Sequence, residues 1–256
     1  MHANKEVFFK FTISKLKKEL ESADQRIIAI SQILSKLPKN INELFEQLRI
    51  IGDVLYPNME KELTIEEYVR LCALENVTEE TLKKISIDKS KAKKILEIQE
   101  IGLSAELEEQ EKIIFINLAK NLQNLLDTKK SLEALEEKLA KTNYPNFSEI
   151  ATPAIACKMI EVAGSFERLS RFPSSTIQLI GAENAFFKAV RTNNKKKTPK
   201  YGFIYNHPLL INLNKKDKAR FARFLAAKIT LAIKGDLGGT DIRKELTNKI
   251  NLKLKK

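Results

Sequence analysis

Lysine and arginine are concentrated in the last part of the chain, and their natural chemistry is the binding of phosphate. Residues 151–256 contain 22 Lys and Arg against 7 Asp and Glu, a net charge of +15, whereas residues 1–150 have a net charge of −3. So much like charge is unfavourable for a folded domain unless a polyanion neutralises it. Because phosphate backbones bind through such cations, the charge distribution predicts that the C-terminal part binds a nucleic acid.

The candidate phosphate-binding cations fall into two groups. One group runs from an expected short helix into a polar loop, and the other lies on an expected longer helix, where Arg220 and Arg223 share a face. Aromatic residues close to these cations are suited to stacking on bases, although at least one of Phe186 and Phe187 is expected in the core. The candidate cations are Lys188, Arg191, Lys195, Lys196, Lys197, Lys200, Lys218, Arg220, Arg223 and Lys228, and the aromatic residues are Phe186, Phe187, Tyr201 and Tyr205.

No constellation of residues points to catalysis or to a cofactor. The chain has no Walker A loop and no G-x-G-x-x-G motif, and "GDLGGT" at 235–240 follows a helix, so it is expected to end that helix with a turn. His207 has no Ser, Cys or carboxylate partner at an informative spacing. Cys72 and Cys157 are expected to be reduced and buried. We therefore expect no enzyme activity, no metal site and no cofactor.

The N-terminal part carries a regular apolar seam. Its members alternate in steps of four and three, a heptad pattern that predicts a long helix packed along a partner helix. Pro38 is expected to end or break this helix, and the pattern then resumes loosely and stops near Pro57. The seam consists of Phe9, Ile13, Leu16, Leu20, Ala23, Ile27, Ile30, Leu34 and Leu37.

Short helices and a second long helix follow. Thr64 and Glu67 have the spacing of a capping box, and Thr78 and Asp88 are suited to cap two further helices. A second heptad helix is expected from Ser104. These elements favour an antiparallel coiled-coil hairpin with a helical tip at about 57–103 over parallel dimerisation. The heptad positions of the second long helix hold Phe115, Leu118, Leu122, Leu125, Lys129, Leu132, Glu136 and Leu139.

A segment with two prolines and no seam, 142–153, separates the two parts of the chain. We place a coiled-coil domain at 1–141 and a compact, mainly helical domain at 142–256, so the predicted fold class is all-α. In the second domain, one helix is expected to end at Gly164. "STIQLI" at 175–180 leaves a buried strand and irregular chain equally open. Further helices are expected at "AENAFFKAVR", "DKARFARFLAAKITLAIKG" and the basic "TDIRKELTNKINLKLKK".

No membrane or secretion segment is evident. No run approaches the length of uninterrupted apolar residues that a transmembrane helix needs. The N-terminus "MHANKEVFFKF" lacks the long apolar core and the small-residue cleavage site of a secretion signal.

Three stretches of the second domain resemble the Nop domain family. They are "AGSFERLSRFPSSTIQLIGAENAFFKAVRT", "TPKYGFIYNHP" and "KARFARFLAAKITLAIKGD", and their order and spacing match over about 143–240. The likeness is greatest to the archaeal scaffold protein of box C/D small ribonucleoproteins, which is related to the eukaryotic nucleolar scaffold pair. Upstream, "LRIIGDVLYPNM" keeps Arg49, Tyr56 and Pro57 of a family element but departs from it at 50–52.

The resemblance implies an RNA-binding scaffold and not a catalyst. Members of the family bind the composite surface formed by a K-turn RNA and the small ribosomal-type protein already bound to it. They also pair through their coiled coils and recruit fibrillarin, which methylates ribose 2′-hydroxyls. The implied partners are therefore a box C/D guide RNA, the small K-turn-binding protein and a second copy of the chain, with fibrillarin left open. The implied location is the cytoplasm in an archaeon and the nucleolus in a eukaryote.

The resemblance also assigns candidate RNA-binding residues. Gly181, Ala182 and Glu183 match the family's Gly-Ala-Glu-Lys signature, and Asn184 stands in place of the Lys. A neutral amide at 184 does not neutralise a phosphate, and the lysines at 195–197 are suited to take over that role. Lys218, Arg220, Arg223 and Lys228 match a basic pattern on the main helix. Asn206 and His207 follow "YGFIY", where relatives often carry a His that approaches RNA.

One large departure from the family pattern leaves other readings open. The archaeal scaffold has a further N-terminal α/β domain that holds fibrillarin, whereas this chain begins almost at the coiled coil, either as a truncated or as a minimal form. The spliceosomal relative also lacks that domain and binds a K-turn in a small nuclear RNA, which makes it the second reading. A third reading, a coiled-coil adaptor whose basic part docks on an acidic protein, leaves "TPKYGFIYNHP" unexplained.

Overall fold

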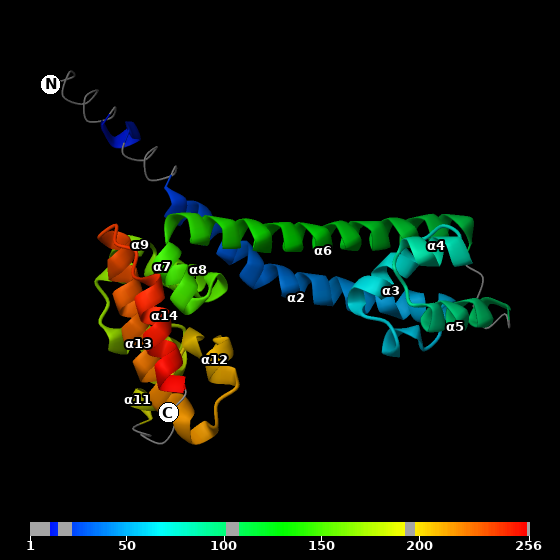
Figure 1. Ribbon diagram of the computed structural model, residues 1–256. Coiled ribbons are helices and arrows are strands. Elements are labelled where there is room, and N and C mark those ends of the chain that lie inside the picture. Colours follow the sequence, from blue (N-terminus) through cyan, green and yellow to red (C-terminus); the bar gives the residue numbers. More distant parts are fainter. Residues whose placement is uncertain (1–10, 15–21, 101–107, 193–197, 255–256) are drawn as a thin grey trace. The chain divides into compact units, whose positions relative to one another are not determined.

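All secondary-structure elements in the described part of the chain are helices. The computed structural model describes residues 11–14, 22–100, 108–192 and 198–254, in which no strand occurs (Figure 1). This confirms the predicted all-α fold. The chain divides into two compact units: unit 1 comprises Met1–Ile33 and Glu133–Lys256, and unit 2 comprises Leu34–Leu132. No helix in the described ranges combines the length and apolar character needed to cross a membrane.

Some residues that the sequence singles out lie outside the described residues. They are Phe9, Leu16 and Leu20 of the first seam, Ser104 at the expected start of the second long helix, and Lys195, Lys196 and Lys197 of the basic loop.

Two long helices contribute to both units: α2 (Ala23–Leu55) and α6 (Glu109–Asn143). In unit 2, Ile41 of α2 and Phe115 of α6 belong to the same apolar core. In unit 1, Ile27 of α2 and Ala140 of α6 belong to another core. The two helices therefore contribute to a common apolar core within each unit. Their pairing along the heptad seams stays a prediction. A single antiparallel hairpin through both units stays a prediction.

Helix α2 continues through Pro38, so the expectation that this proline ends or breaks the helix is wrong. A proline inside a helix removes one backbone hydrogen bond and crowds the preceding turn. Apolar packing on both sides of Pro38 opposes this cost, because Leu37 packs against the core of unit 2 and Ile41 is buried within it. The helix ends at Leu55, close to Pro57, as expected.

Unit 2 is completed by short helices whose caps the sequence predicts. The Thr64 hydroxyl accepts the Glu67 N–H, and the Glu67 carboxylate accepts the Thr64 N–H at 2.8 Å, which confirms the capping box. Thr78 caps the next helix through the Thr81 N–H, and Asp88 accepts the Lys89 N–H at 2.9 Å. The elements are η1 (Met59–Lys61), α3 (Ile65–Cys72), α4 (Glu79–Lys84) and α5 (Lys89–Glu100).

Gly52 explains one of the departures from the family element. A Cβ at residue 52 would lie 2.4 Å from the Tyr68 hydroxyl oxygen, so only glycine lets Tyr68 of α3 pack this closely against α2. Tyr68 is fully buried, and its ring meets that of Phe45 edge-on at a centroid distance of 5.7 Å. The absence of a side chain at residue 52 therefore leaves room for the Tyr68 ring beside α2.

Unit 1 is built around α13, which packs against α7, α9, α10, α12, α14 and η3. Its buried face includes Phe221, Leu225 and Ile229. The turn after it follows the predicted pattern, with Gly238 as C-cap and Gly239 at a φ of 67°. The elements are α7 (Pro145–Ala151), α8 (Pro153–Ala163), α9 (Phe166–Ser170), α10 (Ser174–Leu179), α11 (Glu183–Arg191), η3 (Phe203–Asn206), α12 (Pro208–Ile211), α13 (Lys215–Leu237) and α14 (Arg243–Leu254).

The segment expected to separate two domains is instead part of the core of unit 1. Both of its prolines begin helices, α7 and α8, because proline is tolerated in a first turn. Asp236 of α13 caps α7 by accepting the backbone N–H groups of Asn146 at 2.9 Å and Phe147 at 2.8 Å. The boundary expected at residue 142 therefore differs from the division at 132/133, since the last turns of α6 join this core.

"STIQLI" forms neither a strand nor irregular chain but the short helix α10. Its buried residues, Ile177 and Ile180, are three apart, which is helical spacing rather than the alternation of a strand. Pro173 precedes the helix as its N-cap residue. The expected end of α8 at Gly164 is confirmed, with φ at 83°.

Candidate nucleic-acid interface

The turn between α10 and α11 is specified by two residues of the predicted signature. Gly181 has a φ of +89°, a left-handed conformation that favours glycine. Its N–H donates to Glu183 Oε1 at 2.8 Å. The Glu183 carboxylate therefore stabilises the turn that precedes α11 by accepting a hydrogen bond from the backbone of that turn. Ala182 is the N-cap residue of the helix.

The stretch "KYGF" is fixed to the end of α10 by a set of hydrogen bonds. The side-chain amide of Gln178 donates to the Lys200 backbone carbonyl at 2.6 Å. The backbone carbonyl of Gln178 accepts the Gly202 N–H at 2.9 Å. The Phe203 N–H donates to the Ile180 carbonyl at 2.8 Å. A Cβ at Gly202 would lie 1.9 Å from that carbonyl oxygen, so glycine is required there. Two motifs far apart in the sequence thus form one structure.

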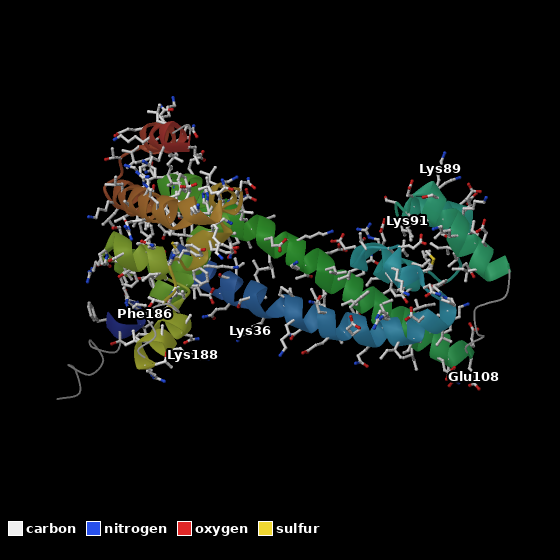
Figure 2. All side chains as sticks on the ribbon, turned by 90° about the horizontal axis from the view of Figure 1, so that it is seen from below. Lys36, Lys89, Lys91, Glu108, Phe186 and Lys188 are labelled. Atoms are coloured by element: carbon white, nitrogen blue, oxygen red, sulfur yellow. The ribbon has the colours of Figure 1, made fainter. Side chains whose placement is uncertain are left out.

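Helix α11 is held by few contacts and presents most of its surface. Only Ala189 is buried. Asn184, Lys188 and Arg191 are exposed and follow one another in steps of four and three, which places them on one face. Figure 2 shows Lys188 and Phe186 on this helix. The polar face therefore carries two cations and, at the site of the expected lysine, one neutral amide.

Neither phenylalanine of α11 belongs to the core, so the expectation for this pair is wrong. Phe187 is 57% exposed and Phe186 is partly exposed. The two rings meet edge-on with centroids 5.9 Å apart. Val190, three residues after Phe187, is 59% exposed. An exposed apolar strip thus lies beside the cationic face of α11. Helical spacing alone does not distinguish an exposed apolar strip from a buried one.

The tyrosines of the basic stretch are occupied by each other and by a lysine. The rings of Tyr201 and Tyr205 stack with centroids 5.1 Å apart. Lys218 Nζ lies 5.2 Å from the centre of the Tyr205 ring and donates to the Ile211 carbonyl at 3.2 Å. Lys218 therefore connects the end of α12 to α13. Unlike the exposed cations of α13, its ammonium group already has contacts within the protein.

The exposed cations of α13 form a row that only partly matches the predicted set. Arg220 and Arg223 are exposed and have no ion pair with any described residue. Lys216, four residues before Arg220, and Lys234, eleven after Arg223, lie on the same face and are also exposed. Lys216 and Lys234 are not among the predicted cations, although their helical spacing from Arg220 and Arg223 already places them on this face.

Lys228 is turned away from this row. Its Nζ lies 5.1 Å from the centre of the Phe224 ring. The hydrogen bond and charge of Lys249 and, more weakly, the charge of Lys228 hold the pKa of the Glu245 carboxyl on α14 below its usual range. Lys228 therefore faces α14, which separates it from Arg220 and Arg223.

His207 is a structural residue, so the expectation that it approaches RNA is corrected. It is 5% exposed. Its Nδ1 accepts the Leu209 N–H at 3.2 Å and caps α12, and its Nε2 lies 3.2 Å from the Ile150 carbonyl oxygen. Burial lowers the pKa of the imidazole, which favours the neutral ring. Both nitrogens are engaged inside the protein, whereas the neighbouring Asn206 is exposed.

The remaining candidates are simple to place. The Lys200 side chain is exposed while its carbonyl holds Gln178. Cys72 and Cys157 are free and buried, as expected. In the described ranges no three His, Cys, Asp or Glu side chains gather as a metal site would require. The described part of this surface consists of cations, an amide and apolar side chains, which are groups suited to binding.

Comparison with known proteins identifies the family. The family model described as "Nop: snoRNA binding domain, fibrillarin" matches residues 33–256. A NOP5 family protein of Methanocaldococcus jannaschii is 32% identical over 241 residues, covering 92% of this chain and 58% of that protein. Nucleolar protein 56 of Dictyostelium discoideum is 30% identical over 237 residues, covering 88% of this chain and 43% of that protein. The chain thus spans about half the length of these relatives.

A solved structure shows the same fold. The crystal structure of a fibrillarin/Nop5p complex contains a chain that is similar with a TM-score of 0.56 at 23% identity, covering 99% of this chain and 77% of that one. The likeness extends over both units and agrees with the match of the family model. The chain belongs to the Nop family.

Proposed function

We propose that this chain is the RNA-binding scaffold of a box C/D-type ribonucleoprotein that guides 2′-O-methylation. In this role it recognises a K-turn RNA together with the small protein bound to that RNA. The supporting observation is the two-sided surface of α11, where Lys188 and Arg191 lie beside the exposed Phe187 and Val190. Cations suit a phosphate backbone, and an apolar strip suits a protein surface. A composite of RNA and protein offers both.

The row on α13 supports additional phosphate contacts. Lys216, Arg220, Arg223 and Lys234 span five turns of one helix face. Because none of the four is paired with a described acidic residue, binding to phosphate would break no ion pair within the described structure. Several such contacts make affinity fall steeply with salt.

Pairing of two copies is the second part of the proposal. On α2 within unit 2, exposed uncharged residues recur in steps of four and three and form a second heptad row outside the buried one. Its members are Asn40, Leu44, Gln47, Ile51 and Val54. On α6 the exposed residues Ile114, Asn117, Asn121, Asn124, Thr128 and Ser131 recur in the same way. In a chain with 30% charged residues, two charge-free rows favour burial against another helix.

Catalysis is assigned to a partner in this proposal. The family description and the solved complex both name fibrillarin, and we expect the methyltransferase reaction to belong to that protein. The chain would then hold RNA and enzyme together, in the nucleolus if its source is a eukaryote and in the cytoplasm if it is an archaeon.

The test of RNA recognition compares three ligands by electrophoretic mobility shift: a K-turn RNA, the small K-turn-binding protein, and their complex. Binding to the complex should be much tighter than to either component and should weaken steeply as salt rises. No binding to the complex or to the naked RNA at low salt would reject the proposal. Binding that does not depend on K-turn geometry would favour an adaptor for acidic partners.

The test of pairing is sedimentation of the full chain. Wild type should be a dimer, and Ile51→Asp should shift it to a monomer because a buried carboxylate would lack a partner. Val162→Asp, on an exposed apolar residue of α8 in unit 1, is the matched control and should remain dimeric. A monomeric wild type at high concentration would contradict the pairing.

A further inference from the structure

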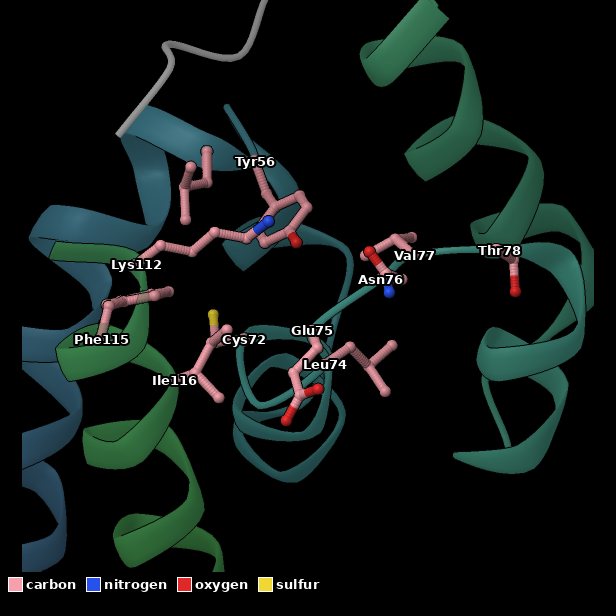
Figure 3. Close-up of a pocket in the computed structure, with 11 residues that line it drawn as sticks. Tyr56, Cys72, Leu74, Glu75, Asn76, Val77, Thr78, Lys112, Phe115 and Ile116 are labelled. Carbon is pink, nitrogen blue, oxygen red and sulfur yellow. The ribbon is translucent and has the colours of Figure 1, made fainter. Parts of the chain in front are cut away.

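Unit 2 contains a pocket that the proposed RNA-binding role does not use. Its volume is about 550 Å³, within the range of ligand-binding pockets. Three segments line it: the end of α2, the connection between α3 and α4, and the first turns of α6 (Figure 3). The lining residues are Leu55, Tyr56, Cys72, Leu74, Glu75, Asn76, Val77, Thr78, Lys112, Phe115 and Ile116.

The pocket continues along α6 as a groove. A second hollow of about 380 Å³ shares Glu75, Asn76, Lys112 and Ile116 with the first. It extends the lining by Glu109, Ile113, Asn117 and Lys120. The combined space is therefore elongated, which suits a chain better than a compact molecule. It also exceeds what a single side chain fills.

The floor of the pocket is apolar but includes one hydroxyl without a partner. Leu55, Leu74, Phe115 and Ile116 supply aliphatic and aromatic surface. Tyr56 is 8% exposed as a residue. Its hydroxyl is not among the fully buried polar atoms that lack a partner, so it remains accessible from the pocket and can donate to a ligand there. Burial raises the pKa of this hydroxyl above its usual range, so it remains a donor.

The charges at the rim leave one cation free. Glu75 Oε1 lies 2.9 Å from Lys120 Nζ, so this carboxylate is already paired. Lys112 lines the pocket with Tyr56 and Asn76 (Figure 3) and forms no ion pair with a described residue. Its charge contributes weakly to lowering the pKa of the Glu75 carboxyl, after the main contribution from Lys120. The unpaired groups are thus a lysine ammonium and a tyrosine hydroxyl, both donors. Their complement is a carboxylate.

We infer that this groove binds an extended segment of a partner protein in which an apolar side chain adjoins an acidic residue. The apolar side chain occupies the floor formed by Phe115, Ile116 and Leu74, and the carboxylate meets Lys112 and the Tyr56 hydroxyl. Nucleic acid is a poor fit, because the described residues of the groove offer one unpaired lysine, Lys112, whereas a nucleic acid carries a phosphate at every nucleotide.

The inference is tested with a phage-displayed library of random nonapeptides selected on the full chain. Selected peptides should share an apolar residue next to Asp, Glu or the terminal carboxylate. Their affinity, measured by fluorescence anisotropy, should fall about tenfold or more in Lys112→Glu, where an attraction becomes a repulsion. Tyr56→Phe should also weaken binding without lowering stability, because its hydroxyl has no partner in the described structure to lose.

Lys138→Glu is the matched control, an exposed lysine on the same helix in unit 1, and it should leave peptide affinity unchanged. Peptides selected without an acidic preference, or bound equally by Lys112→Glu, would overturn the inference. So would a shift of Lys112→Glu from dimer to monomer in sedimentation, since the groove would then belong to self-association. Wild-type RNA binding by Lys112→Glu is expected, which separates this test from that of the RNA-binding role.

Discussion

The ring of Phe203 occupies the space that a side chain at residue 181 would need, since a Cβ built on Gly181 lies 2.6 Å from two of its ring carbons. The two residues are joined further by the bond from the Phe203 N–H to the Ile180 carbonyl. The direction of α11 thus depends on a contact between two motifs twenty-two residues apart.

Gly181→Ala should destabilise the protein and weaken RNA binding together. The left-handed φ costs an alanine about 1–2 kcal/mol, and the clash with Phe203 adds to it. We expect a loss of about 2–4 kcal/mol in the free energy of unfolding, measured by urea denaturation.

Gly164→Ala is the control for that substitution. Gly164 has a nearly equal φ of +83°, but its Cβ would have no heavy atom within 4 Å. Only the conformational cost should remain, and RNA affinity should be unchanged. Equal losses in the two variants would show that Phe203 does not confine residue 181.

Replacing Arg220 and Arg223 together by alanine should weaken RNA binding without unfolding unit 1. Both side chains are exposed and have no ion pair with a described residue, so stability should change little. Each phosphate contact removed should lower the slope of log affinity against log salt by about one. The measurement is a salt titration of RNA affinity beside a thermal melt.

The matched comparison is Lys218→Ala combined with Lys228→Ala on the same helix. These lysines contact Tyr205, the Ile211 carbonyl and Phe224. The pair should therefore affect stability more than the salt slope. If instead this pair reduced the slope as much as the arginine pair, the division of α13 into two faces would be wrong.

Glu136 should make stability depend on pH. It is 8% exposed and faces Ser31 of α2 as well as Lys158 and Glu161 of α8, with Glu133 on its own helix. Burial raises the pKa of its carboxyl to about 7. Its contribution is fully present below the unfolded pKa near 4.5 and is lost as pH rises to about 7. Glu136→Gln should therefore stabilise the fold at pH 8 by up to about 3 kcal/mol relative to its effect at pH 4.

Glu137→Gln tests whether this effect belongs to Glu136. Glu137 is exposed and pairs with Lys141 one turn later, so its loss should cost less than about 1 kcal/mol at neutral pH. Urea denaturation of both variants at several pH values is the measurement. A Glu136→Gln variant with no stability gain at high pH would contradict the raised pKa.

Asp236→Ala should be among the most damaging substitutions of a charged residue in unit 1. The carboxylate accepts the backbone N–H groups of Asn146 and Phe147 and the side-chain amide of Asn146. Leaving partly buried donors without acceptors costs about 1–3 kcal/mol for each group. We expect a loss of about 3 kcal/mol or more by calorimetry. Asp217→Ala, in the exposed first turn of the same helix, should lower the free energy of unfolding much less. Equal losses in the two variants would contradict the capping role of Asp236.

The amino-acid sequence by itself determined the features that depend on neighbours along the chain. Charge distribution separated a basic part from a mildly acidic one, heptad spacing found the long helices, and the Thr64–Glu67 spacing found a capping box. Gly164 ended its helix as expected, because a left-handed C-cap is a local requirement. The family motifs indicated the all-α fold before any tertiary contact was known.

Only the tertiary structure decided which of these residues are free to act. Lys218 and Lys228 look like Arg220 and Arg223 in sequence, but Tyr205 and Phe224 contact the lysines and leave the arginines exposed. His207 is buried because Ile150, fifty-seven residues away, meets its ring. Helix α2 continues through Pro38 because the apolar packing of Leu37 and Ile41 outweighs the cost of a proline inside a helix. Tyr205 and Ile150 come from distant segments, and periodicity carries no information about which distant segments meet. Phe224 lies one turn before Lys228 on the same helix, but the sequence does not show that the two side chains meet.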